Sequence, residues 1–410
     1  MGKAVALVAT LDTKGAELTY LRSVLAKMGV GSVVIDIGVF PPEGLIPDVP
    51  REKIAELGGQ GLDELKNKRR DEIMRVMGDG LRKCLLDLYR KEEIGGALAV
   101  GGNQGTAVAS MGFRGLPFGF PKVIVSTVAS GNVRPYIGHK DITMMFSVAD
   151  FLGGVNAVIR PVLDNAAAAV GGMMREKPVV GPEDQKKGRI ATTAFGNTHG
   201  AVVRAKALLE EAGYEVIPFH ASGACGSAME ELIAAGYFTG VLDLTTHELV
   251  GEVLGHDIYT PVLPGRLETA GREGIPQVVA PGGLNYYCFG PVESVPGFLR
   301  KRATHYHNPY NTNVRTTREE LNKLGEVMAG RLNASRGPVA VVIPLQGWSE
   351  NGREGKPLYD PDADRALVEA LRRYLRKEIP LIEVDAHIND PGFVEVAVEQ
   401  LLSMMEKKKS

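Results

Sequence analysis

The same local pattern opens each half of this 410-residue chain: a short apolar strand, a turn that carries glycine, and an amphipathic helix. In the first half the strand spans residues 5–9, the turn spans residues 10–15, and the helix ends at Gly29. In the second half a strand at 190–195 and a turn at 196–200 precede a helix that ends at Gly213. Apolar strands that alternate with helices are typical of mostly parallel sheets covered on both faces. The pattern predicts an α/β fold with two Rossmann-like domains, mostly parallel sheets and an internal duplication.

A stretch rich in proline and lysine, residues 177–189, separates the two halves and marks the expected boundary, near residues 175–189. The predicted domains are residues 1–180 and residues 188–410. The second is expected to contact a substrate or a second copy of the chain. Residues 41–61, rich in proline and glycine, are predicted to form a long surface connection, and connections of this length often act as functional lids.

Composition excludes several classes of protein. No apolar run of about 20 residues occurs, so no transmembrane helix is expected. The N-terminus does not have the pattern of a signal peptide. The three cysteines are few and widely spaced, which fits a reducing compartment and argues against disulfides or a CxxC zinc site. The cysteine pattern predicts a cytoplasmic protein, and the net charge of -2 gives no reason to expect nucleic-acid or membrane partners.

Glycine is in excess, at 50 of 410 residues or about 12%, against a usual value of about 7%. One cluster follows the predicted strand at 97–100 and opens a helix; it consists of Gly101, Gly102, Asn103, Gln104, Gly105 and Thr106. Glycines let backbone N–H groups approach an anion, and the helix N-terminus adds its dipole. The cluster matches neither the Walker A nor the G-x-G-x-x-G pattern. It predicts a phosphate-binding loop; the alternative is a tight turn whose glycines serve packing.

Two further loops follow predicted strands of the first half. One carries Ser126, Thr127, Ser130 and Gly131, whose hydroxyl groups suit phosphate or sugar oxygens; the alternative is a turn rich in hydroxyl groups. The other carries Asp12, Thr13 and Lys14. There a lysine can face a phosphate and an aspartate can hold Mg²⁺ or a ribose hydroxyl, or the aspartate simply caps a helix. Ligands of open α/β sheets bind beyond the carboxyl ends of the strands, where these loops are expected to meet.

The remaining polar motifs carry weaker signals. Loops at 196–200, 222–227, 281–285 and 344–349 could line a second pocket or simply turn the chain. His305 and His307 have a metal-site spacing without an identifiable carboxylate partner, so a structural role is expected. The sequence at 246–248 lacks the second histidine of a zinc protease motif, and Cys225 is expected to be inert. No G-x-S-x-G elbow supports serine-hydrolase chemistry.

A set of motifs along nearly the whole chain resembles one family. They lie at residues 9–15, 101–106, 116–123, 126–131, 136–138, 163–167, 307–309, 315–317 and 343–349. The chain is similar to an uncharacterised protein family that shares its fold with the ATP-binding N-terminal domain of the tomato mosaic virus resistance protein. The resemblance implies ATP with Mg²⁺ in the first half and a homodimer or higher homo-oligomer. The sequence differs from the family in one loop. The family loop is often Gly-Gly-Ser-Gly-Gly-Thr, whereas this chain has Asn103 and Gln104 in place of the serine and the following glycine.

The leading hypothesis is therefore a cytosolic ATP-binding protein of unknown reaction. Its nucleotide is held by the loops at 12–14, 101–106 and 126–131. One alternative is a phosphoryl or glycosyl transferase that acts on a small metabolite, the possible second ligand, in a cleft between the domains. The other is a non-catalytic regulator in which the nucleotide sets the domain angle. Neither catalytic residues nor metal ligands are identified by the sequence.

Overall fold

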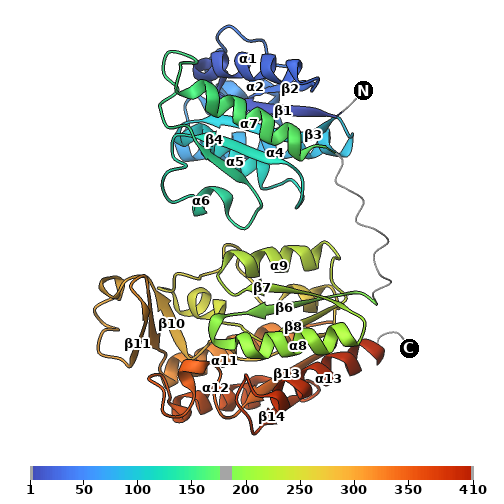
Figure 1. Ribbon diagram of the computed structural model, residues 1–410, viewed down its shortest axis with the longest axis vertical. Helices are drawn as coiled ribbons and strands as arrows, with labels where there is room; N and C mark the ends of the chain where they lie inside the picture. Colours follow the sequence, from blue (N-terminus) through green and yellow to red (C-terminus); the bar gives the residue numbers. More distant parts are fainter. Residues whose placement is uncertain (1–2, 176–186, 408–410) are drawn as a thin grey trace. The chain divides into compact units, whose positions relative to one another are not determined.

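The chain folds into two compact units, Met1–Val179 and Val180–Ser410, in a computed structural model that describes residues 3–175 and 187–407 (Figure 1). Most of the boundary predicted at residues 175–189, namely residues 176–186, lies outside the described residues. Each unit has its own sheet and its own hydrophobic cores. The units are therefore described one at a time.

Unit 1 alternates strands with helices. Its elements are β1 (Ala4–Ala9), α1 (Leu11–Lys27), β2 (Ser32–Asp36), α2 (Arg51–Gly58), α3 (Leu62–Leu65), α4 (Arg70–Arg90), β3 (Ile94–Gly101), α5 (Asn103–Phe113), β4 (Lys122–Ser126), α6 (Arg134–Ile137), β5 (Thr143–Phe146) and α7 (Ile159–Met173). The five strands form one parallel sheet in the order β2-β1-β3-β4-β5. Alternate strand residues point to opposite faces, so one face packs on α1 and α7 and the other on α2, α4 and α5.

Unit 2 begins in the same way and adds further elements. These are β6 (Arg189–Ala194), η1 (Gly196–Thr198), α8 (His199–Glu211), β7 (Glu215–His220), α9 (Ala224–Ala234), β8 (Gly240–Asp243), η2 (Val250–Leu254), α10 (Thr269–Arg272), β9 (Gln277–Val279), β10 (Tyr286–Phe289), η3 (Val292–Ser294), β11 (Thr304–Asn308), β12 (Asn311–Arg315), α11 (Arg318–Asn333), β13 (Val339–Pro344), η4 (Glu350–Gly352), α12 (Pro361–Tyr374), β14 (Leu381–Val384) and α13 (Pro391–Lys407).

The large sheet of unit 2 has the strand order of unit 1 with one strand added. From one edge the order is β7-β6-β8-β9-β13-β14, so β6 and β7 take the places of β1 and β2. All its strand pairs are parallel. The predicted α/β fold with two Rossmann-like sheets is thus confirmed, and the shared order agrees with the predicted duplication. A three-stranded antiparallel sheet, β10-β12-β11, was not predicted.

The predicted surface connection at 41–61 is wrong in part, because it contains helix α2 with buried Ile54 and Ala55. This helix lies against α4 at a pair of glycines. A Cβ at Gly58 would come within 2.2 Å of the Val76 carbonyl oxygen, and a Cβ at Gly80 within 1.9 Å of the Ile54 carbonyl oxygen. These glycines therefore bring two helix backbones together.

Helix α11 begins with a capping box that is joined to an ion pair. The Thr317 hydroxyl accepts the Glu320 N–H, and the Glu320 carboxylate accepts the Thr317 N–H at 2.8 Å. The same carboxylate accepts bonds from the Arg302 guanidinium at 2.7 and 3.1 Å and from the Tyr287 hydroxyl at 2.8 Å. Burial alone would raise the pKa of Glu320, but these donors outweigh burial and hold that pKa below its ordinary value. The carboxylate thus favours the folded state.

Substituting Glu320→Gln is expected to lower the free energy of unfolding at pH 7 by about 1.5 kcal/mol, since charge-assisted hydrogen bonds are lost. A depressed carboxyl pKa contributes stability above the unfolded-state pKa of Glu, and that contribution is lost as pH falls through the folded-state pKa. Wild type and variant should therefore converge as the pH is lowered from 5 to about 3. Urea unfolding followed by Trp348 fluorescence measures this; a difference independent of pH would contradict it.

Candidate functional site

The loops predicted to bind nucleotide meet at the switch point of the unit 1 sheet. The chain passes from β1 to one neighbour, β2, and then returns to β3 on the other side. In open parallel sheets, ligands bind outside the carboxyl ends of the two strands where the order reverses. The turn predicted at 10–15 is wrong from Leu11 on, where α1 begins directly after β1. Residues 101–106 end β3 and open α5, and residues 126–131 follow from the end of the next strand. The sheet therefore brings all three predicted loops to one edge.

The glycines of the second loop have distinct roles. Gly101 ends β3, and a Cβ there would lie 2.8 Å from the Thr106 nitrogen, so this glycine lets helix α5 close against its own strand. Gly102 is the N-cap of α5, and no described side chain caps the helix at this residue. A Cβ at Gly102 would meet only the Thr127 hydroxyl, at 3.8 Å. With exposed Asn103 and Gln104, this end of α5 is open.

Two of the hydroxyl groups that were predicted to bind a ligand form a hydrogen bond with each other instead. Thr106 and Ser126 are fully buried and their hydroxyl oxygens lie 2.6 Å apart. The Ser126 hydroxyl also accepts the Val128 N–H at 3.2 Å. These two residues join neighbouring loops and do not face solvent, whereas Thr127 is half-buried and the 130–131 pair is exposed. Gly105 is also buried.

The first turn of α1, directly after β1, holds a lysine that is bonded to the backbone and a half-buried aspartate. Lys14 donates from Nζ to the Phe151 carbonyl at 2.8 Å, so in this conformation its charge serves the protein backbone. Exposed Thr13 bonds to the Thr10 hydroxyl at 2.9 Å. Asp12 is half-buried, and burial raises the pKa of its carboxyl although Thr13 and Lys14 act in the opposite direction.

A second carboxylate, which the sequence analysis missed, lies beside Asp12. Asp36 ends β2 and is fully buried; its Oδ1 accepts the Leu11 N–H at 3.1 Å and the Gly38 N–H at 2.8 Å. Its Oδ2 has no hydrogen-bond partner among the described residues. A Cβ at Gly38 would lie 3.1 Å from Asp36 Oδ1 and 3.3 Å from Asp12 Oδ1. The signal available in the sequence was a charged residue at the end of an apolar strand.

In unit 2 the backbone N–H groups of one predicted ligand loop, residues 222–227, already bind a side chain of the protein. Glu248 Oε1 accepts the Gly223 N–H at 2.5 Å and the Gly226 N–H at 3.2 Å, so this carboxylate occupies the N-terminus of α9. Its Oε2 pairs with Arg266, which is 1% exposed. The loop at 222–227 therefore turns the chain around an internal anion and is not open to a ligand.

A cavity of about 190 Å³ opens at the carboxyl edge of the unit 2 sheet. It is lined by Phe195, Gly196, Asn197, His220, Tyr259, Tyr286, Cys288, His307, Asn311 and Asn313. The predicted loop at 196–200 supplies two of these residues, and the unpredicted sheet of β10, β11 and β12 supplies several others. His305 and His307, the predicted pair on β11, have ring centroids 6.0 Å apart.

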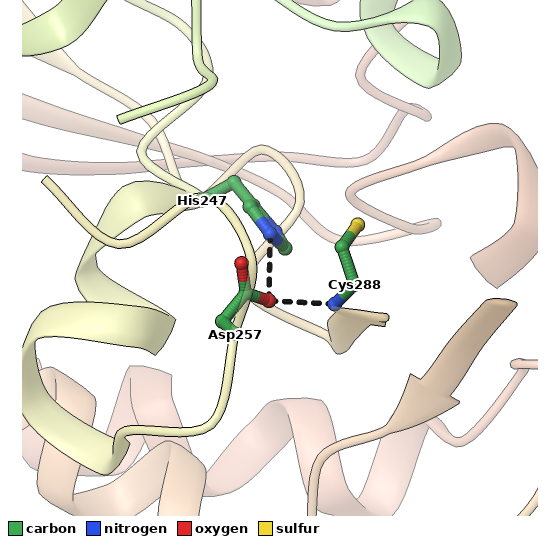
Figure 2. A group of neighbouring side chains, drawn as sticks. All are labelled: His247, Asp257 and Cys288. Atoms are coloured by element: carbon green, nitrogen blue, oxygen red, sulfur yellow. Dashed lines mark hydrogen bonds and ion pairs between the residues drawn. The ribbon is translucent and has the colours of Figure 1, made fainter. Parts of the chain in front are cut away.

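Beside this cavity, His247, Asp257 and Cys288 form a buried group (Figure 2). Asp257 Oδ2 lies 3.1 Å from His247 Nε2 and accepts the Cys288 N–H at 2.6 Å. Burial opposes protonation of His247, but Asp257 and Cys288 outweigh it and raise its pKa well above the ordinary value. Burial also raises the pKa of the Cys288 thiol. Sequence reasoning missed the group because its members are far apart along the chain.

Among residues 3–175 and 187–407, no helix combines the length and the apolar composition that crossing a bilayer requires.

Comparison with known proteins identifies two matched domains. Residues 3–178 match the N-terminal domain of the Uncharacterised protein family (UPF0261), and residues 187–405 match its C-terminal domain. A UPF0261 protein of Clostridium tetani is 42% identical over 410 residues, covering 99% of this chain and 100% of the relative. The tomato ToMV resistance protein Tm-1(GCR237) is 32% identical over 424 residues, covering 98% of this chain and 56% of that protein.

Solved structures are far less similar. The UDP-GlcNAc 2-epimerase of Methanocaldococcus jannaschii is 11% identical with a TM-score of 0.23, covering 98% of this chain and 93% of the epimerase. The glycosyltransferase SnogD of Streptomyces nogalater is 12% identical with a TM-score of 0.20, covering 99% and 100%. Such scores carry no argument about chemistry. The family matches do decide membership: the chain belongs to the uncharacterised protein family UPF0261 and contains both of its domains.

Proposed function

We propose that unit 1 binds ATP together with Mg²⁺ at the carboxyl edge of its sheet. The observation that carries this proposal is the coincidence of two features. An open, glycine-initiated helix, α5, starts at the strand end where the order of the sheet reverses. That place is where parallel α/β sheets bind ligands, and a helix N-terminus of this kind favours anions.

The phosphates would be held mainly by backbone groups. The first N–H groups of a helix have no acceptor within it, and those of α5 belong to Asn103, Gln104 and Gly105. Because backbone N–H groups are independent of side-chain identity, Asn103 and Gln104 can replace the family residues without loss of these donors. Thr127, Ser130 and Gly131 are accessible for the remaining oxygens. The buried Thr106 and Ser126 would act indirectly, by holding the two loops together.

The residues present also fit a magnesium ion. Asp12 and Asp36 place carboxylates side by side at the ends of β1 and β2, and one buried oxygen of Asp36 lacks a partner among the described residues. Magnesium prefers one or two carboxylates together with phosphate oxygens and water. When bound, the ion would neutralise charge on the phosphates. Lys14, two residues after Asp12, would help to bind the phosphates once its hydrogen bond to the Phe151 carbonyl is replaced by one to a phosphate oxygen.

The variant Gly102→Val tests the position of the phosphates. The new side chain has room against the protein, since a Cβ there meets only a hydroxyl at 3.8 Å, yet it would stand where phosphate oxygens must approach the α5 N–H groups. Calorimetric titration with ATP and Mg²⁺ is expected to show an affinity at least about tenfold weaker than wild type, a loss of about 1.4 kcal/mol.

The control is Gly172→Ala in α7, where a Cβ meets nothing within 4 Å. This variant should bind ATP as wild type does. Equal affinity in Gly102→Val would place the phosphates elsewhere, and no heat from wild type at millimolar ATP would refute the proposed function.

A further inference from the structure

The group formed by His247, Asp257 and Cys288 brings three different donor atoms together. The histidine nitrogen, the carboxylate oxygen and the thiol sulfur all lie within 4.8 Å of one another, and all three residues are buried. Asp257 and Cys288 are contributed by a loop and by β10, and His247 follows β8 (Figure 2). In the part of the chain that the structure describes, no other group of three such residues is found.

The hydrogen bonds around His247 leave two acceptor atoms facing each other, Nε2 of the ring and Oδ2 of Asp257. Nδ1 lies 2.6 Å from the Gly283 carbonyl oxygen, which can only accept, so Nδ1 must carry the proton. In the neutral imidazole, Nε2 is then an acceptor, and it faces the Asp257 Oδ2 acceptor at 3.1 Å. Either a proton or a metal ion must therefore lie between these two atoms.

We propose that His247, Asp257 and Cys288 bind a divalent transition metal of the zinc class. A mixed set of nitrogen, oxygen and sulfur donors suits this class, and three protein ligands leave a fourth position for a water or a substrate. Calcium and magnesium, which require oxygen ligands, do not fit a thiolate. This proposal concerns unit 2 and is independent of nucleotide binding by unit 1.

The surroundings of the group match those of a metal centre. Metal-bound histidines usually donate their other ring N–H to a backbone carbonyl, as His247 does to Gly283. The Asn313 side-chain amide donates to Cys288 Sγ at 3.2 Å, which would stabilise a thiolate. Asp257 is oriented by the Tyr259 N–H at 2.7 Å on one oxygen and by the Cys288 N–H on the other. All three ligands are thus oriented by neighbouring groups.

The cavity beside the group supplies access. Cys288 forms part of its wall together with Asn313, whose amide bonds to Cys288 Sγ, so the cavity lies next to the thiol. A volume of about 190 Å³ suits a small metabolite, and the amides of Asn197, Asn311 and Asn313 line it together with His307. A small molecule with a carboxylate, carbonyl or hydroxyl oxygen would fill the fourth position on the metal.

A cysteine nucleophile is the competing interpretation, and a titration with a metal ion separates it from a metal site. A base that activates a thiol needs a ring nitrogen directed at the sulfur. In this structure Nδ1 of His247 faces Gly283 and Nε2 faces Asp257, and the ring also forms a side-chain hydrogen bond with Cys288. A nucleophilic thiol without a metal would give no cobalt–thiolate band, whereas a metal ligand would give one.

The test is a titration of the purified, metal-stripped full chain with Co²⁺ alone, with Zn²⁺ as competitor. We expect one ion per chain and a cobalt–thiolate charge-transfer band in the near ultraviolet that Zn²⁺ abolishes. Cys288→Ser should remove the band, and Cys225→Ser, which alters a cysteine outside the group, should keep it. Asn313→Ala should weaken binding by about 10- to 100-fold while keeping the band, as expected for a residue that only orients a ligand.

The absence of a thiolate band in the wild type would overturn the proposal and leave a proton between His247 and Asp257. So would an unchanged band in Cys288→Ser. Circular dichroism shows whether each variant is folded. The band of the wild type tests the proposal even where a variant fails to fold. ATP titration of the same samples separates this result from the fate of the unit 1 site.

Discussion

Replacing Arg266 by methionine is expected to lower the free energy of unfolding of unit 2 by about 3–5 kcal/mol. The buried guanidinium pairs with Asp243 at 2.9 Å, Glu248 at 2.5 Å and Glu230 at 2.7 Å. Burial disfavours the charge, but the three carboxylates outweigh it and raise the pKa of Arg266 well above its ordinary value. Methionine keeps much of the volume and leaves carboxylates buried without a counter-charge.

The loss is expected to depend on pH. Burial raises the pKa of both Asp243 and Glu248, with Arg266 acting against it, so without the guanidinium these carboxyls hold protons more strongly. A raised carboxyl pKa makes the folded state relatively less stable as pH rises above the unfolded-state pKa. The deficit of the variant should therefore be largest near pH 8 and should shrink toward pH 5.

Trp348 makes the measurement specific to unit 2, because it is the single tryptophan of the chain and is buried there. Its emission in urea gives the unfolding midpoint. Arg365→Met, which removes an arginine that is 62% exposed, is the matched control and should change stability by no more than about 0.5 kcal/mol. If Arg266→Met also stayed within that range, the buried ion cluster would not stabilise unit 2.

Substituting Gly80→Ala is expected to destabilise unit 1 by about 1–3 kcal/mol, the usual cost of forcing atoms into a packed core. The added methyl carbon would lie 1.9 Å from the Ile54 carbonyl oxygen, which belongs to the backbone of α2 and cannot rotate away. Helices α2 and α4 would have to separate. In an exposed helix the same change would stabilise, because alanine has the higher helix propensity.

Amide hydrogen exchange resolved by segment checks this prediction. Exchange in α2 and α4 should accelerate in Gly80→Ala, whereas Gly172→Ala, with open space around the new methyl group, should leave it unchanged. Unaltered protection of α2 in Gly80→Ala would mean that the two helices do not depend on the glycine contact.

The parallel sheets were predictable because their signals are local. Each strand is a short apolar run beside a helix with three- and four-residue spacing, and the two openings resemble each other. The antiparallel strands β10, β11 and β12 escaped prediction for two reasons. Strands β11 and β12 form a hairpin of largely polar residues, without the apolar run that marked the parallel strands. Strand β10 is apolar, but it pairs with β12 at the far end of a long connection, and no local pattern records such a contact.

The roles of the glycines also divide into those that the sequence predicts and those that only the fold reveals. The excess predicted ligand loops, and Gly102 does stand at an open helix N-terminus at the switch point. Gly58 and Gly80, in contrast, serve helix contact, and Gly226 makes room for the Glu248 carboxylate. Whether a glycine faces a ligand, a helix or a buried side chain depends on what the fold brings opposite it. For the same reason Asp36 and Cys288 were overlooked, and His247 was set aside because no second histidine follows it in the sequence.

The proposed nucleotide site places the triphosphate of ATP against the first turn of α5. A crystal structure of the full chain with millimolar ATP and Mg²⁺ is the decisive measurement. We expect phosphate oxygens within hydrogen-bond distance of the N–H groups of residues 103–105, with Mg²⁺ on the side of Asp12 and Asp36. Nucleotide bound away from the loops at 101–106 and 126–131, or no nucleotide under these conditions, would contradict it.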